Sequence, residues 1–192
     1  MSGPSDSELV SAAQEGDRDA FADLVRLHHP NVYGLCLGML GDPAAADDAA
    51  QEAFLSAWKA LKSFKGDSAF GTWLHRIAAN KCLDALRRSA RRGEDSLDAI
   101  LEGGGSRSES VQAGGRGPEE AAAAADLSAK VMGSLSDEYR LVLTLREVQG
   151  LSYEEIMTVM DCSLDSVKAR LRRAREAALE RLRHFSGGGG VL

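Results

Sequence analysis

The chain has 192 residues, enough for one large domain or two small ones, each with its own core. Its net charge of −6 excludes a uniformly basic protein. Three widely spaced cysteines without a CxxC pair argue against a disulfide framework or a zinc site and favour a reducing compartment.

The N-terminus has neither a basic nor an apolar leader region, so no signal peptide is expected. No apolar run approaches the length that crosses a membrane. We therefore expect a soluble, cytoplasmic protein with no membrane insertion.

Charge is strongly segregated along the chain. Residues 72–92 contain six Lys/Arg and one acid, whereas residues 94–126 contain eight acids and two arginines. A second basic segment, 163–184, has seven Lys/Arg against three acids. Nucleic-acid binding is thus compatible with the negative net charge.

Almost every periodic segment of the first half predicts a helix. We expect Pro30 to kink or break the chain and Ser68 to cap the last of these helices. The expected helices are 7–15, 17–27, 32–40, 44–64 and 69 to about 88.

Residues 93–118 differ in kind, because they are rich in Gly, Ser and acids and poor in large apolar residues. Such a segment cannot bury enough surface to offset its ordering entropy, so it predicts a flexible acidic linker. Four helices are expected after it, at about 119–133, 136–148, 152–160 and 164–184. Residues 186–192 predict a disordered tail. The fold class is therefore all-α: two small helical domains joined by a flexible acidic linker.

The stretch 147–176 carries the pattern of a helix-turn-helix. Ser152 and Glu155 form a candidate capping box, and Ser163 is a candidate cap for the next helix. In that helix an apolar stripe recurs at three- and four-residue steps, formed by Val167, Leu171, Ala174, Ala178 and Leu182. The second helix of such a motif can enter the major groove of DNA.

The face opposite this stripe is the one available to DNA. It carries Asp165, Ser166, Ala169, Arg172 and Arg173, flanked by Lys168, Arg170 and Arg175. Arginine and lysine contact phosphates and read guanine, so this face favours DNA binding. The alternative is a solvated surface helix at the end of a bundle.

Three features of the first half are not explained by the packing of a simple helical bundle. Acids line one side of 46–54, aromatic residues and a lysine occupy 64–74, and a basic helix continues to Arg88. Basic residues interleaved with aromatics are what single-stranded nucleic acid requires.

At these residues the chain resembles the bacterial extracytoplasmic-function sigma factors of the sigma-70 family. The motifs are DDAAQEAFLSAWKAL, FKGDSAFGTWLHRIAANKCLDALRR and LREVQGLSYEEIMTVMDCSLDSVKARLRRARE, in the order of that family. The resemblance implies a region 2 domain over 1–92, a linker over 93–118, a region 4 domain over 119–185 and a tail over 186–192.

The resemblance also implies a function, which is to bind core RNA polymerase and direct it to promoters. It assigns core binding to Asp47, Asp48, Gln51, Glu52 and Phe54. It assigns the −10 element and strand opening to Phe64, Lys65, Ser68, Phe70, Thr72, Trp73, Arg76, Asn80, Lys81 and Asp84. It assigns the −35 element to Ser163, Ser166, Lys168, Arg170, Arg172 and Arg173.

Several of these residues have a second interpretation. For Phe54 we favour core packing, and Phe70 and Trp73 are of a type found more often in cores than on stacking surfaces. Arg172 stands where some relatives have an apolar or aromatic residue, so its part in base reading stays open. The implied partners are core RNA polymerase, promoter DNA and an anti-sigma factor.

Two other classes compete with this interpretation. A DNA-binding regulator such as a response-regulator output domain would explain only the second half. An enzyme would need a site, but the four histidines have no metal-ligand spacing and no nucleophile motif is present. We expect no catalytic residue, no metal site and no cofactor.

Overall fold

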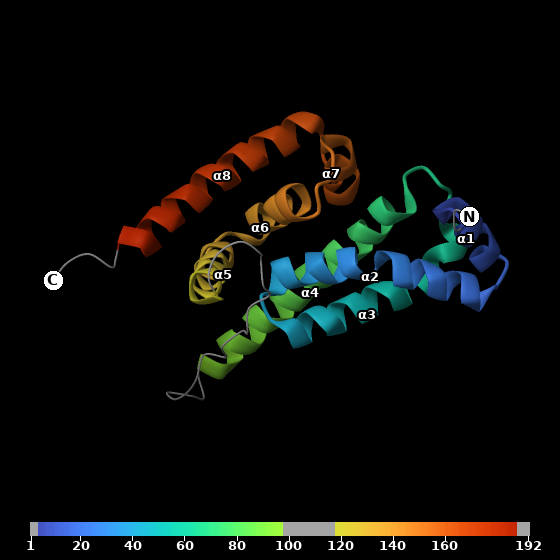
Figure 1. Cartoon of the computed structure of the whole chain (residues 1–192), viewed down its shortest axis with the longest axis horizontal. Helices are drawn as coiled ribbons and strands as arrows, with labels where there is room; N and C mark the ends of the chain where they lie inside the picture. The colour runs from blue at the N-terminus through green and yellow to red at the C-terminus, as the bar shows by residue number, and fades with distance from the viewer. Residues whose placement is uncertain (1–3, 98–117, 188–192) are drawn as a thin grey trace.

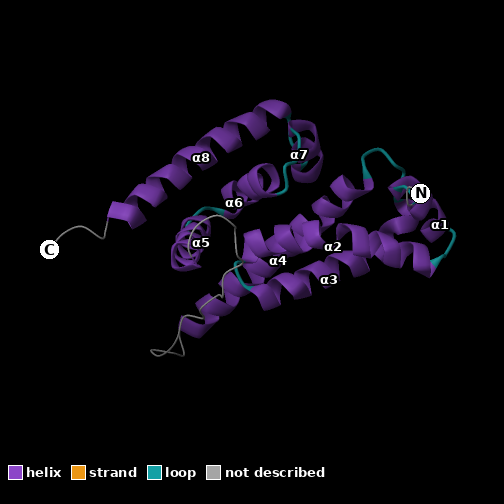
Figure 2. Cartoon of the chain, in the orientation of Figure 1, coloured by secondary structure: helices purple, strands orange, loops and turns teal. Residues whose placement is uncertain are grey.

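The computed structural model describes residues 4–97 and 118–187, and within these ranges every regular element is a helix (Figure 2). The elements are α1 (Asp6–Gln14), α2 (Arg18–Leu40), α3 (Pro43–Ala60), the 3-10 turn η1 (Leu61–Ser63), α4 (Phe70–Leu97), α5 (Pro118–Gly133), α6 (Asp137–Leu143), the π-helical turn η2 (Thr144–Val148), α7 (Tyr153–Met160) and α8 (Leu164–Gly187). The predicted all-α class is confirmed. None of the helices in these ranges is long and apolar enough to cross a membrane. Most of the predicted linker and the last five residues lie outside the described residues.

Side chains that satisfy free backbone groups fix where several helices begin. The backbone N–H of Ser152 donates to the Glu155 carboxylate at 2.8 Å, and the Glu155 N–H donates to the Ser152 hydroxyl at 3.2 Å. The predicted capping box of α7 is thus confirmed, and Ser5 with Glu8 forms another at α1. The predicted cap at α8 is also present, since the Ser166 N–H donates to the Ser163 hydroxyl.

Three expectations about helix ends are wrong. Pro30 does not break the chain, because α2 runs through it. The loss of one helical hydrogen bond costs about 3 kcal/mol, and burial of Leu24, Val32 and Leu35 on the same helix offsets it. Ser68 does not cap α4.

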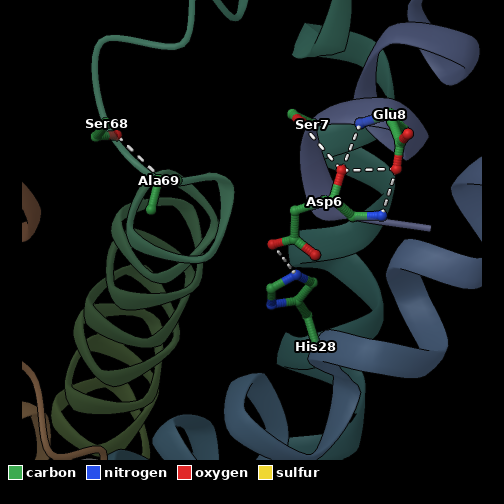
Figure 3. Close-up of polar contacts among 7 residues, drawn as sticks. Asp6, Ser7, Glu8, His28, Ser68 and Ala69 are labelled. Atoms are coloured by element: carbon green, nitrogen blue, oxygen red, sulfur yellow. Dashed lines mark hydrogen bonds and ion pairs between the residues drawn. The ribbon is translucent and has the colours of Figure 1, made fainter. Parts of the chain in front are cut away.

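Ala69 holds the cap position of α4 instead, since its carbonyl accepts from the Trp73 N–H at 3.1 Å. The Ser68 hydroxyl donates to that same carbonyl at 3.3 Å, as Figure 3 shows. At its other end α4 continues to Leu97, beyond the point where the linker was expected to start. A single glycine such as Gly93 costs only about 1 kcal/mol in a helix, which does not stop a helix of this length.

The first domain, α1 to α4, closes around an apolar core. Leu24 and Leu35 of α2 and Leu74 of α4 are fully buried. His28 ties α2 to α1, with its Nε2 2.9 Å from the Asp6 carboxylate (Figure 3). The elements that carry the acidic, aromatic and basic motifs are therefore held together as one body.

The second domain, α5 to α8, packs the helix-turn-helix on α6. Ile156 of α7 and Val167 and Leu171 of α8 are fully buried, as the predicted stripe requires. The stripe ends earlier than expected, because Leu182 is 40% exposed.

The two domains lie against each other in this structure. Helix α7 packs on α4, and η2 packs on α2, so the buried residues of both domains form one continuous cluster. Figure 1 shows α6 and α7 next to α2 and α4, with α8 on the outer side of α6. The chain is thus described in a closed arrangement rather than as two separated bundles.

Candidate nucleic-acid interface

The acidic side of α3 is open to solvent. The side chains of Asp47, Asp48, Gln51 and Glu52 are exposed, and the Gln51 amide donates to the Asp47 carboxylate at 2.7 Å. Phe54, at the edge of the buried face of the same helix, is 7% exposed, which confirms its interpretation as a core residue. A charged, acceptor-rich surface is therefore presented on a rigid helix.

The aromatic residues before and at the start of α4 form a cluster of their own. Phe64 and Trp73 have ring centroids 4.9 Å apart, and Phe70 and Trp73 5.6 Å apart. Phe70 is buried, whereas Phe64 and Trp73 are half-buried. Phe70 is therefore a packing residue that supports the other two, and only these two have faces that a base could reach. Lys65 beside them is exposed.

The exposed side of α4 is basic and faces the acids of α3. Glu52 lies 3.9 Å from the Lys81 ammonium and 3.9 Å from the Arg88 guanidinium. Asn80 and Asp84 are exposed on the same helix. A shallow depression of about 350 Å³ lies here, lined by Glu52, Lys81, Asp84, Arg87, Arg88 and Arg91. The residues assigned to the polymerase and to the −10 element therefore border one another.

The recognition helix α8 presents a split set of cations. Lys168, Arg172 and Arg173 are exposed, as the helical periodicity predicts. Arg172 also pairs with Glu176 one turn on, at 3.1 Å. Ser163 and Ser166 stand at the start of the helix, where its N-terminal N–H groups favour a phosphate.

Two other arginines of α8 are held by acids of the same domain. Arg170 pairs with Glu138 at 3.4 Å, and its side chain is 27% exposed. Arg175 pairs with Glu147 at 2.7 Å, and this hydrogen-bonded carboxylate raises the pKa of Arg175. Both pairs anchor the recognition helix to the elements that precede it, so Arg170 is placed differently from the other predicted −35 residues.

Two predicted −10 residues face the second domain. The Thr72 hydroxyl donates to the Glu155 carboxylate at 3.2 Å, and the Arg76 guanidinium donates to Asp161 at 3.3 Å. Hydrogen bonds that the Glu155 carboxylate accepts from Ser152, with that from Thr72, keep the pKa of Glu155 below its ordinary value. Thr72 is 4% exposed as a result.

Between these two residues, His75 is buried at the same junction. It is 6% exposed and its Nε2 has no hydrogen-bond partner. Burial lowers the pKa of His75, although the Gly71 carbonyl, which accepts from its ring, acts in the opposite sense. His75 is therefore neutral in this arrangement.

These contacts between the domains could not be predicted from the amino-acid sequence. Glu155 has an evident role as a helix cap, which left no reason to expect a second role against Thr72. His75 could be judged only by its lack of metal-ligand spacing. Contacts between domains follow neither helical periodicity nor motif spacing, so no local pattern could have found them.

Two family models match the chain, and together they cover both domains. Sigma-70 region 2 matches residues 24–92, and Sigma-70 region 4 matches residues 129–177. The first match spans α3, the aromatic cluster and the basic side of α4. The second spans the helix-turn-helix.

Curated relatives match over nearly the whole chain. The RNA polymerase sigma-H factor of Pseudomonas aeruginosa is 41% identical, over 90% of this chain and 91% of its own length. The ECF RNA polymerase sigma-E factor of Escherichia coli is also 41% identical, with the same coverage of each chain. The ECF sigma factor SigW of Bacillus subtilis is 36% identical over 91% of this chain and 95% of its own.

Solved structures share the fold. CnrH, in complex with the cytosolic domain of CnrY, gives a TM-score of 0.66 at 27% identity and covers 96% of this chain and 99% of its own. The sigma factor RpoE of Bartonella quintana, in complex with the anti-sigma factor NepR, gives 0.67 at 24% identity, over 85% and 96% of the two chains.

Proposed function

The chain belongs to the extracytoplasmic-function group of the sigma-70 family of RNA polymerase sigma factors, and we propose how its two domains divide that work. As a sigma factor it binds core RNA polymerase and directs transcription from a set of promoters. The single observation that carries the proposal is the presence of both family regions, in order, on one chain.

We propose that α3 docks on the polymerase through its exposed acids. Asp47, Asp48, Gln51 and Glu52 supply acceptors on a helix whose other side is fixed in the core. Phe54 acts by holding that helix in place. Asp47, Asp48 and Gln51 are exposed to an approaching polymerase, whereas Glu52 also lies close to Lys81 and Arg88 of α4.

The −10 element falls to the aromatic cluster and the basic side of α4. Phe64 and Trp73 offer half-exposed rings for stacking, which contributes about 1–3 kcal/mol per base. Lys65, Arg76 and Lys81 supply charge for the phosphates, and Asn80 and Asp84 are placed for a base that leaves the helical stack. Ser68 and Thr72 border this surface, and Phe70 supports it from within.

The −35 element falls to α8. Ser163 and Ser166 at its start suit a backbone phosphate, and Lys168, Arg172 and Arg173 project from its free side. Arg170 takes part by holding α8 against Glu138 rather than by reading bases.

Regulation and location follow from the same membership. Two structurally similar proteins are described in complexes, the sigma factor RpoE with the anti-sigma factor NepR and CnrH with the cytosolic domain of CnrY. We infer that an anti-sigma factor also controls this chain. We further infer that the chain itself acts in the cytoplasm, where core polymerase transcribes, and that it catalyses no reaction.

The test combines binding with transcription. Purified chain is titrated into core RNA polymerase, and the holoenzyme then transcribes fragmented genomic DNA while start sites are sequenced. We expect a complex with core and a common pair of upstream motifs before the new start sites. Duplex DNA binding without any core binding would instead favour the response-regulator class.

A further inference from the structure

The last residue of α1 holds the turn that leads into the aromatic cluster. The side-chain amide of Gln14 donates to the Leu61 carbonyl at 3.0 Å and to the Phe64 carbonyl at 2.8 Å. Leu61 begins the 3-10 turn η1, and Phe64 is the residue that follows it. Both N–H donors of one amide are therefore used on the two ends of this turn.

The other hydrogen bonds of this segment are local. In the described part of the chain, those outside the regular helices run between residues no more than four positions apart, as from the Phe64 N–H to the Leu61 carbonyl. The loop that follows, 65–67, is exposed. Gln14 thus supplies the polar connection between this turn and a helix that lies about 50 residues earlier in the chain.

The residue that Gln14 holds carries one of the two accessible rings of the cluster. Phe64 is half-buried, and its ring lies 4.9 Å from Trp73 and 5.9 Å from Phe70, measured between centroids. A bond to the Phe64 carbonyl fixes the backbone from which this ring projects. A ring that is already oriented binds a base at a lower entropic cost than one that must be ordered on contact.

The first residue of α1 acts on the same cluster from its other end. The Asp6 carboxylate lies 2.9 Å from Nε2 of His28, as Figure 3 shows. The His28 ring in turn packs edge-on against Phe70, with centroids 5.2 Å apart. Leu9 of α1 is buried, so the helix itself is fixed to the domain. The two ends of α1 therefore support two different aromatic residues of the cluster.

We propose that Gln14 is a positioning residue for strand opening: its amide sets the turn that presents Phe64, so that the ring can receive an unstacked base of the −10 element. The inference rests on the proposed function of the aromatic cluster. It extends that function to α1, which precedes the residues 24–92 that the region 2 model matches. Gln14 acts through Phe64 and contacts no base itself.

A purely structural role for Gln14 would have different consequences. Loss of a bond that only stabilises the domain would lower every activity of the chain that depends on folding. Loss of a positioning bond should change the steps that need the −10 strand and leave binding to core polymerase and to −35 duplex as they were. The experiment therefore measures these activities side by side.

Variants of Gln14 separate its donors from its volume. Gln14→Leu removes both N–H donors at similar size, and Gln14→Glu keeps the shape but offers only acceptors, which covers the case in which leucine disturbs the packing. Gln14→Lys restores a donor of similar reach. Ser11→Lys is the matched control, because it adds the same charge at an exposed position of α1.

Each chain is assembled with core RNA polymerase and given one promoter from the start sites mapped with the unaltered chain. A fluorescent base analogue in the −10 element reports the rate of strand opening, and anisotropy gives the affinity for a −10 single strand and for −35 duplex. We expect Gln14→Leu and Gln14→Glu to lower the opening rate and the strand affinity about tenfold. Gln14→Lys should recover most of both, and Ser11→Lys should match the unaltered chain.

Unchanged opening and strand affinity in folded Gln14→Leu and Gln14→Glu would overturn the inference. So would an equal loss of −35 affinity or core binding, because that result is the mark of a general defect. A Gln14→Lys chain as impaired as Gln14→Leu would show that the donor is not what matters.

A double-mutant cycle tests whether Gln14 acts through Phe64. Phe64→Leu alone should slow opening, and adding Gln14→Leu to it should cause little further loss, whereas a general loss of stability would add to the first effect. Additive losses would therefore contradict the inference. If Phe64→Leu leaves opening unchanged, the proposed function of the aromatic cluster has failed. An effect of Phe64→Leu without any effect of Gln14→Leu overturns the positioning role alone.

Discussion

Arginines of one helix differ in what their guanidinium groups can reach. Arg170 is engaged by Glu138, whereas Arg172 and Arg173 are exposed on the side of α8 that faces away from the core. Only the second kind can add a contact to DNA without giving up one inside the protein. The residues assigned to the −35 element are therefore not equivalent, although the resemblance to the family assigns the same role to all of them.

Replacing Arg172 or Arg173 by alanine should weaken binding to the −35 duplex and leave core binding intact. Loss of a base contact should cost about 1–3 kcal/mol, whereas loss of a phosphate contact should reduce the slope of log affinity against log salt concentration by about one. Fluorescence anisotropy across a salt series separates the two roles. Arg181→Ala, another exposed arginine of α8, serves as the control. Loss of core binding with unchanged −35 affinity would contradict the assignment.

His75 makes closure sensitive to acid. Burial lowers the pKa of His75 in the closed chain, so its contribution to closure is present above the ordinary value of about 6.5 and is lost as the pH falls. The nearby His28 of α2 disfavours a positive charge on His75, whereas the Glu155 carboxylate of α7 favours it. The Glu155 carboxylate stays ionised throughout this window because its own pKa is lowered.

Small-angle scattering between pH 7.5 and 5.5 tests whether the contact between the domains weakens as the pH falls. The radius of gyration should rise as the pH falls in the unaltered chain, and His75→Gln should remove most of that rise. The same expansion in both chains would show that a group other than His75 is responsible.

At the scale of elements, short polar side chains decide where helices begin. Ser152→Ala removes the cap of α7 and should cost about 1 kcal/mol of stability. The contribution of the Glu155 carboxylate to stability is complete above the pKa of about 4.3 that it has in the unfolded chain. It is lost as the pH falls through the lowered pKa that Glu155 has in the folded chain. Thermal unfolding measures both effects. Thr158→Ala, which removes only a back-bond to the Glu154 carbonyl in the same helix, should be nearly neutral; an equal loss in both variants would argue against capping.

Local chemistry explains which elements the sequence could predict. The caps at Ser152 and Ser163 and the stripe through Leu171 depend on neighbours within a few residues, so they are legible in the chain. Continuation of α2 through Pro30 depends on packing by residues far along the chain, and no local rule contains that energy. The π-helical turn at Thr144 is likewise set by its contact with α2.

In the candidate site, too, some features could be predicted from local sequence and others depend on tertiary contacts. Exposure of Lys168 and Arg173 follows from helical periodicity and was predictable. The pairing of Arg170 with Glu138 and the burial of Thr72 under Glu155 follow from tertiary contacts, so they were not. Helical periodicity identifies a buried face but does not identify which surface covers it.

At the scale of the whole molecule, one chain must serve two geometries. The domains touch in this structure, and each carries a surface proposed to bind a different promoter element. The 20 residues between α4 and α5 can reach at most about 3.3–3.6 Å each. A connection of that length allows separation by several tens of ångströms without breaking either domain.

The most direct test of the account is transcription with purified components. Holoenzyme assembled from core RNA polymerase and the full chain is given fragmented genomic DNA, and the 5′ ends of the transcripts are sequenced. We expect new start sites that share a −35 and a −10 motif. When Arg172 and Arg173 are replaced by alanine, the start sites should no longer share the −35 motif. The absence of both core binding and new start sites would contradict it.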